Sequence, residues 1–330
     1  MKKILLLFFL SSVIQTNAQV LRKRTVTLMG GRWDITIVAK SRAVAEQHID
    51  TVIAEVSRIE NLISDWIPQS QVSQVNSNAG IRPVKVDREL FELTQRALQL
   101  SKITGGAFDI SFAAMDRIWK FDGSMTAMPS PEAIKKSVEK VGYKNMVLDS
   151  INSTIYLKLK GMKIGFGSLG EGYAADKGRT LMQRKGIKAG IINGSGDMST
   201  WGRQPNGKYW NIGITNPFKT DTIIAVVPLK QSAVVTSGSY EKFVVFNGKR
   251  YAHIINPVTG YPATGLLSVT VFGPSAERAN GFSTSMMVLG KDAALRFIQK
   301  FPAYSYILIT DKGSIYSSPK LNFKKQQLKN

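Results

Sequence analysis

The chain has 330 residues, no cysteine, and 44 lysine and arginine residues against 23 aspartate and glutamate residues, which gives a formal net charge of +21 at pH 7. The absence of cysteine excludes disulfide bonds and lipid attachment through cysteine. The basic residues are dispersed, apart from four lysines in the tail, and no aromatic-basic recognition module is present, so a generally basic surface is favoured over nucleic-acid binding.

The first 18 residues have the pattern of a secretory signal peptide. Lys2 and Lys3 precede the apolar residues 4–10, and the small residues 16–18 form an acceptable cleavage site. The apolar run is too short for a spanning helix, and no other stretch is long and apolar enough for one. We therefore expect an exported, soluble protein, periplasmic if its source has two membranes, in which residues 19–330 form a single domain.

The N-terminal half is predicted to hold one strand and three helices, with long loops between them. The strand carries Met29-Gly30-Gly31 near its middle, where glycine suggests the close approach of another backbone or a ligand. Residues 64–80 form a long polar loop with one large aromatic, Trp66, and residues 107–111 present the carboxylate of Asp109. The elements expected here are a strand at residues 25–39 and helices at residues 42–63, 87–103 and 130–141.

Residues 163–202 form the stretch around which the rest of the chain is organised. Residues 163–166 are predicted to end a strand, residues 169–185 to form a helix, and residues 187–193 to form a buried strand that leads into Gly194-Ser195-Gly196-Asp197. Ser168 and Glu171 have the spacing of a capping box. The free N–H groups at this helix start suit a phosphate. The alternative is an ordinary strand–helix–strand unit with glycines in its loops.

The C-terminal half is predicted to consist mainly of short strands, followed by two helices and a closing hairpin. Asn247-Gly248 is a hairpin turn, and Asn256 to Pro262 form a rigid turn. The strands are expected at residues 209–215, 222–229, 233–236, 242–246, 250–255, 267–272, 304–310 and 314–317, and the helices at residues 276–289 and 293–301.

Short motifs, taken in chain order, resemble the ApbE-like family of FAD:protein FMN transferases. Each motif is weak alone, but together they cover nearly the whole chain after the signal peptide. They are Met29-Gly30, Ser64-x-Trp66 through Ser70 and Asn76, Gly106 to Asp109, Gly172 to Asp176, Gly194 to Asp197, Thr236-Ser237-Gly238, His253 to Gly260, Ser268 to Val271, and Ser283-Thr284. The resemblance implies an α+β fold, ApbE-like and T-fold-like, in which antiparallel sheets pack with helices.

The resemblance also implies an activity. The family cleaves the pyrophosphate of FAD with Mg²⁺ and transfers FMN to a threonine or serine of a target protein, usually an exported domain of a redox membrane complex. By this resemblance His253 would be the base that accepts the proton of the acceptor hydroxyl. The other implied FAD-contacting residues are Met29, Trp66, Ala107, Phe108, Asp109, Glu171, Asp197, Ser237, Ile254 and Ile255. Thr284 and the carbonyl of Gly170 match the family's metal ligands, and Asn280 is a further candidate ligand at a position where the family usually has Asp.

Several of these residues also have structural interpretations. His253 could be a strand residue that packs on Tyr251, Trp66 could be a core anchor, and Asp197 could hold its own loop.

Three positions depart from the family pattern. The family usually has Asp where this chain has Gly165, Lys where it has Glu171, and Asp where it has Asn280. Asn280 and Thr284 are one helical turn apart and are predicted to face the same way. Glu171 is then either a helix-capping residue or a ligand that replaces the carboxylate lost at position 280, because Mg²⁺ favours carboxylate oxygens over neutral ones.

Three functions therefore remain open from the sequence. The first is an FMN transferase with an altered metal site, and the second is a non-catalytic FAD-binding protein in which this site has degenerated. The third is a structural or adaptor protein that uses its basic surface to hold an acidic partner. Neither the acceptor protein nor the oligomeric state can be read from the sequence.

Overall fold

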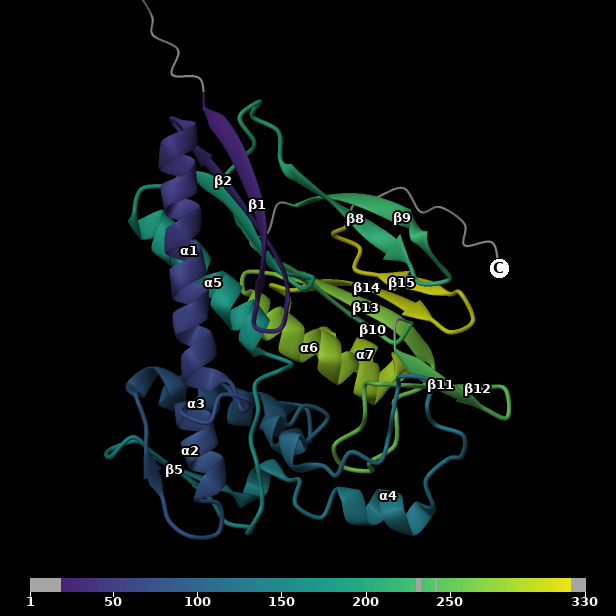
Figure 1. The fold of residues 1–330 in the computed structure, drawn as a ribbon. Helices are drawn as coiled ribbons and strands as arrows, with labels where there is room; N and C mark the ends of the chain where they lie inside the picture. The colour runs from purple at the N-terminus through teal and green to yellow at the C-terminus, as the bar shows by residue number, and fades with distance from the viewer. Residues whose placement is uncertain (1–18, 230–232, 241, 322–330) are drawn as a thin grey trace, which may run out of the picture.

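A computed structural model describes residues 19–229, 233–240 and 242–321 (Figure 1). The predicted signal peptide lies outside these residues. The main sheet has eight strands in the order β1-β2-β6-β7-β10-β13-β14-β15, and the pairs between these neighbours are antiparallel. Its strands are β1 (Val20–Leu28), β2 (Gly31–Ala39), β6 (Ala189–Gly194), β7 (Asp197–Trp201), β10 (Ala233–Gly238), β13 (Leu266–Gly273), β14 (Ser305–Thr310) and β15 (Ile315–Ser317).

Helices cover one face of this sheet, as Figure 1 shows. They bury a large apolar core that includes Trp33, Ile35, Val52, Ala175 and Phe282, each with no more than a trace of exposed surface. The four helices on this face are α1 (Arg42–Ile63), α5 (Gly170–Arg184), α6 (Ala276–Leu289) and α7 (Lys291–Ile298).

A two-stranded hairpin covers the other face. Strands β8 (Trp210–Asn216) and β9 (Lys219–Leu229) pair antiparallel and bury a second apolar cluster against the sheet. Trp210 and Ile224 from the hairpin meet Val38, Val234 and other sheet residues in this cluster. The part of the sheet around β13 is therefore covered on both faces, which explains why every residue of β13 is buried.

The remaining elements form a smaller region at one end of the main sheet, at the lower edge of Figure 1. A third apolar cluster there contains Met115, Trp119 and Ile134, and Trp119 stacks on Tyr251 with ring centroids 5.8 Å apart. The elements of this region are α2 (Gln71–Ser77), β3 (Val84–Lys85), α3 (Arg88–Ile103), a 3₁₀ helix at Ile110–Ala114, α4 (Pro131–Ser137), β4 (Met146–Asp149), β5 (Thr154–Leu157), β11 (Phe243–Phe246) and β12 (Lys249–Ala252).

The structure confirms the α+β class and corrects several local predictions. Residues 25–39 are not one strand: Met29 and Gly30 both have positive φ and form the turn between β1 and β2. The 64–80 segment is not all loop, because Ser70 caps α2. Residues 163–166 are not in a strand, and α4 ends at Ser137 rather than at residue 141.

The membrane prediction can be examined only in the described part of the chain. There, no helix combines the length and the apolar character that a membrane span requires.

Candidate functional site

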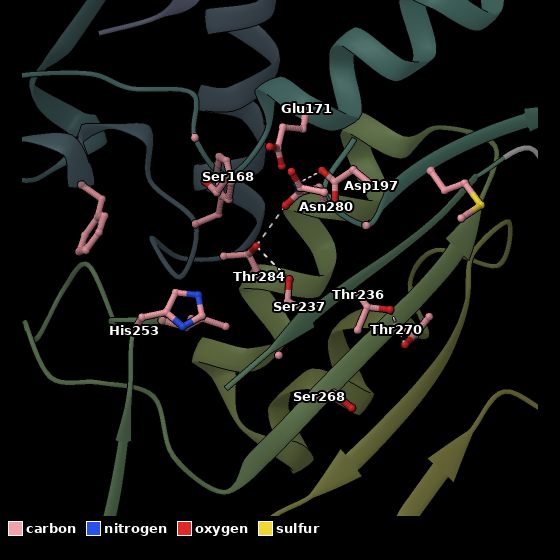
Figure 2. A pocket seen from close by; sticks show the side chains of 18 of the residues that line it. Ser168, Glu171, Asp197, Thr236, Ser237, His253, Ser268, Thr270, Asn280 and Thr284 are labelled. Carbon is pink, nitrogen blue, oxygen red and sulfur yellow. Dashed lines mark hydrogen bonds between the residues drawn. The ribbon is translucent and has the colours of Figure 1, made fainter. Parts of the chain in front are cut away.

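A cavity of about 830 Å³ opens between the end of the main sheet, the start of α5 and the region that carries β11 and β12 (Figure 2). Two groups of side chains stand out in it. One is an oxygen cluster, which we define as Glu171, Asp197, Asn280 and Thr284, and the other is His253 on the opposite wall. The elements that meet here are far apart in the sequence, so the site exists only in the folded chain.

Hydrogen bonds connect three members of the oxygen cluster, Asp197, Asn280 and Thr284. The Asn280 side-chain amide donates to Asp197, Thr284 donates to the Asn280 oxygen at 3.3 Å, and Ser237 lies 3.3 Å from the Thr284 hydroxyl. This confirms that Asn280 and Thr284, one turn apart on α6, face the same way. The nitrogen and the oxygen of the Asn280 side-chain amide therefore both take part in hydrogen bonds. Figure 2 shows these contacts as dashed lines.

Asp197 is the most buried charge-bearing group of the cluster. Burial raises the pKa of its carboxyl to about 8, and the neighbouring Glu171 carboxylate acts in the same direction. Hydrogen bonds from Asn280 and from the backbone N–H of Gly172 oppose this rise. Asp197 therefore accepts a hydrogen bond from the first turn of α5. One of the backbone N–H groups that were predicted to be free for a phosphate is thus already bonded within the protein.

Glu171 is not a helix cap, which contradicts the structural alternative for this residue. The N-cap of α5 is Leu169, with no side-chain cap bond, so Ser168 does not take part in a capping box. The Glu171 carboxylate instead hydrogen-bonds to Ser195 in the β6–β7 turn and lines the cavity. Burial raises its pKa above the ordinary value. Gly31 permits this contact, because a Cβ there would lie 2.1 Å from the Ser195 hydroxyl oxygen.

His253 lies on the wall opposite the oxygen cluster and is exposed to the cavity. Its Nδ1 lies 3.3 Å from the carbonyl oxygen of Lys242, and its ring meets Phe121 edge to face, with centroids 6.5 Å apart. A carbonyl can only accept, so this contact favours a proton on Nδ1 and places the basic lone pair on Nε2. Tyr251, the packing partner in the structural alternative for His253, stacks on Trp119.

The Gly106–Asp109 segment lines the cavity, but the Asp109 carboxylate is committed to its own loop. One oxygen accepts from the backbone and hydroxyl of Ser111, at 2.8 and 2.7 Å, and the other accepts from the backbone of Tyr143 at 2.6 Å. Ala107 and Phe108 are buried beside it and also line the cavity. Asp109 therefore shapes the wall that a ligand would touch.

The other candidate residues divide into those at the cavity and those behind it. Trp66 is 72% exposed on the rim, under the guanidinium of Arg117, so it is not a core anchor. Ser237, Ile254 and Ile255 line the cavity. Met29 and Gly170 are not among the described residues that line it: the Met29 methyl group packs at the start of α5, 3.3 Å from where a Gly170 Cβ would stand.

Among the cavity residues that were not predicted from the sequence, two bear on the oxygen cluster and its neighbourhood. Ser195 bonds to Glu171, and its only signal was its place in the Gly-Ser-Gly-Asp turn. Asp65 lines the cavity with its carboxylate oxygen 3.3 Å from where a Gly165 Cβ would stand. The family that the chain resembles usually has an aspartate at the position of Gly165. A search of the other motifs for a replacement carboxylate could therefore have found Asp65, which precedes Trp66.

Comparisons with known proteins agree with one another. A family model described as the ApbE family matches residues 29–308. The FAD:protein FMN transferase of Treponema pallidum is 31% identical over 293 residues, covering 82% of this chain and 80% of its own. The crystal structure of the ApbE protein from Thermotoga maritima aligns with a TM-score of 0.80 at 29% identity, covering 91% of this chain and 97% of its own. The flavinyl transferase ApbE of Pseudomonas stutzeri gives 0.79 at 25% identity, with 91% and 94% covered.

Proposed function

The chain belongs to the ApbE family, and from this premise we propose that it is an FAD:protein FMN transferase that modifies a threonine or serine of an exported protein. The observation that carries the proposal is a single cavity with His253 on one wall and the oxygen cluster on the other. Such a cavity offers a base to an incoming hydroxyl and a polar, anion-rich wall that suits a cation.

The proposed reaction is a phosphoryl transfer. The hydroxyl oxygen of the acceptor attacks the phosphorus on the FMN side of the FAD pyrophosphate, the bond between this phosphorus and the bridging oxygen breaks, and AMP leaves. His253 Nε2 accepts the hydroxyl proton, because the Lys242 carbonyl holds the ring with its other nitrogen protonated. The product is a phosphoester between FMN and the acceptor side chain.

The donors of the oxygen cluster fit a hard divalent cation such as Mg²⁺. No group of three or more His, Cys, Asp or Glu side chains in the described ranges could hold a metal, so a cation here would depend on mixed donors. These are two carboxylates, Glu171 and Asp197, with the amide oxygen of Asn280 and the hydroxyl of Thr284. The raised pKa of buried Asp197 supports this fit, since a carboxyl that burial keeps from ionising gains most from a nearby cation. Mg²⁺ there would offset the charge of the pyrophosphate.

The lost carboxylate at position 280 makes Glu171 the decisive residue for cation binding. In this proposal Glu171 supplies the negative charge that Asn280 cannot. The Glu171→Gln variant should therefore raise the Mg²⁺ concentration needed for FAD cleavage, and Asn280→Asp should lower it again in the double variant. FAD binding, followed by the fluorescence of the flavin, should be saturable in four proteins: the wild type, the single variants Glu171→Gln and Asn280→Asp, and the double variant.

The same titrations separate the alternatives. FAD that binds in all four proteins but is cleaved in none, at any Mg²⁺ concentration, would leave the non-catalytic FAD-binding protein. No saturable FAD signal at tens of micromolar, which corresponds to roughly −6 kcal/mol, would instead leave the adaptor protein. Equal Mg²⁺ dependence in the wild type and Glu171→Gln would refute the role given to Glu171.

A further inference from the structure

Asp176 lies on α5, behind the oxygen cluster rather than in it, and is not among the described residues that line the cavity. Both of its carboxylate oxygens accept hydrogen bonds. Oδ1 accepts from the Ser199 hydroxyl at 2.8 Å, and Oδ2 accepts from the Ser275 hydroxyl at 2.8 Å and from the backbone N–H of Glu277 at 3.2 Å. Arg179 lies 3.4 Å from Oδ1.

These bonds join the three elements that carry the oxygen cluster. Asp176 and Glu171 share α5, Ser199 and Asp197 share β7, and Ser275 is the N-cap of α6, which carries Asn280 and Thr284. Each element is thus attached to the same carboxylate within two to nine residues of the side chain that it contributes to the cluster. Within a rigid helix or strand, a fixed point at this distance also fixes the side chain that projects into the cavity.

Asp176 also stabilises the N-terminal end of α6. Glu277 is in the first turn of α6, and its N–H group has no partner within its own helix. The Asp176 carboxylate satisfies this group and places negative charge at the positive end of the helix dipole.

Backbone contact makes this junction tight. A Cβ at Gly172 would lie 2.6 Å from the carbonyl oxygen of Ala276, so the starts of α5 and α6 touch without an intervening side chain. Gly172 and Asp176 are four residues apart and therefore lie on the same face of α5. The two residues together leave α6 little freedom to shift relative to Glu171 and Asp197.

We propose that Asp176 is a positioning residue that sets the spacing between the two carboxylates of the oxygen cluster and the Asn280–Thr284 pair. The proposal rests on the proposed function, because the cluster is taken to bind the divalent cation that serves FAD cleavage. It assigns Asp176 a role in cation affinity beyond its contribution to stability.

The test compares Asp176→Asn with Ser275→Ala, which removes one of the bonds, and with Tyr173→Phe as a matched control. Tyr173 is also on α5, and it donates its hydroxyl to Glu89 of α3 rather than to Asp176. Two measurements are made on each purified full-length protein without FAD. One is amide hydrogen exchange in residues 276–284, and the other is the affinity for Mn²⁺, followed by the electron paramagnetic resonance of the free ion.

Asp176→Asn should speed exchange in residues 276–284 and weaken Mn²⁺ binding by at least about tenfold, as substitutions behind metal ligands commonly do. Ser275→Ala should act in the same direction with a smaller effect. Tyr173→Phe should leave both measurements near wild type even where it lowers the melting temperature.

Wild-type Mn²⁺ affinity in Asp176→Asn would overturn the proposal, and so would equal losses of affinity in Asp176→Asn and Tyr173→Phe. If Asp176→Asn does not fold, Ser275→Ala decides by the same two measurements, and wild-type Mn²⁺ affinity in that variant would overturn the proposal. Faster exchange in the Asp176 variant without any Mn²⁺ binding by the wild type would reduce Asp176 to a helix cap. That last result would count against cation use by the site, whereas FAD binding and FMN transfer would remain open to their own tests.

Discussion

At the scale of single residues, the buried polar groups beside α5 bring several carboxyl groups close together. Asp197 is only 5% exposed, and Glu171 and Asp176 act on it as further negative charges. Asn280 partly offsets this by donating its amide hydrogen. The chain thus combines an amide at position 280 with a carboxylate at position 171, an arrangement that favours a cation near Glu171 and Asp197.

The raised pKa of Asp197 predicts a specific pH dependence of stability. The folded chain keeps a proton on this carboxyl up to about pH 8, whereas the unfolded chain releases it near the ordinary aspartate pKa of 3.8. The folded state therefore binds more protons between these values, and the contribution of Asp197 to stability falls as the pH rises through this window. In chelator, Asp197→Asn should show a smaller loss of unfolding free energy between pH 5 and pH 8 than the wild type.

Urea unfolding at several pH values measures this difference. Asp221→Asn serves as the control, since Asp221 is exposed on β9 and its removal should leave the wild-type pH dependence in place. A wild-type slope in Asp197→Asn would contradict the assignment of the proton to this carboxyl.

His253 should matter more for the rate of transfer than for FAD binding. A base acts on the hydroxyl proton in the transition state, so its loss should lower the rate by roughly 10²–10⁴-fold. His253→Asn should keep the FAD affinity within a small factor of the wild type. Single-turnover transfer rates and FAD titrations measure the two effects separately, and a collapse of affinity with a normal rate per bound FAD would make His253 a binding residue only.

At the scale of the elements, the sequence predicted most helices well and hairpins less well. The apolar period of α1 and the Pro131 start of α4 are local signals, and both helices form where these signals indicate. The turn at Met29-Gly30 was missed because positive φ at a methionine has no propensity signal. The capping box at Ser168 failed because Glu171 has a better partner in Ser195, which is distant in the sequence.

Two glycines on α5 offer a matched test of the contact between α5 and α6. At Gly172 an added Cβ would meet the backbone of Ala276 at 2.6 Å, whereas at Gly178 it would meet the flexible end of Ile192 at 2.7 Å. Gly172→Ala should cost roughly 1–3 kcal/mol of unfolding free energy, because backbone cannot yield. Gly178→Ala should be close to neutral, because the gain in helix propensity, up to about 1 kcal/mol, offsets the shift of Ile192.

Chemical denaturation of both variants provides the comparison. Equal losses of unfolding free energy would show that the close approach of α5 and α6 is not what limits position 172. Gly172→Ala should in addition weaken Mn²⁺ binding, since it displaces the start of α6 from Glu171.

At the scale of the whole molecule, the sheet order and the site could not be derived from local patterns. Strand β10 lies between β7 and β13 in the main sheet. The β8–β9 hairpin, which precedes β10 in the chain, is not part of this sheet and covers its other face. These arrangements depend on contacts between distant residues. The motif resemblance supplied His253, Asn280 and Thr284 as site residues, but only the folded chain places Glu171 beside Ser195 and Asp65 beside Gly165.

The central claim is that this chain moves FMN from FAD onto a hydroxyl side chain. The most direct measurement incubates the purified protein with FAD, Mg²⁺ and a library of peptides that each carry one threonine, beside a matched library with valine in its place. The account predicts release of AMP and a covalently bound flavin, detected by mass, on threonine peptides alone. Saturable FAD binding with neither AMP nor a flavin-bearing peptide in either library would contradict it.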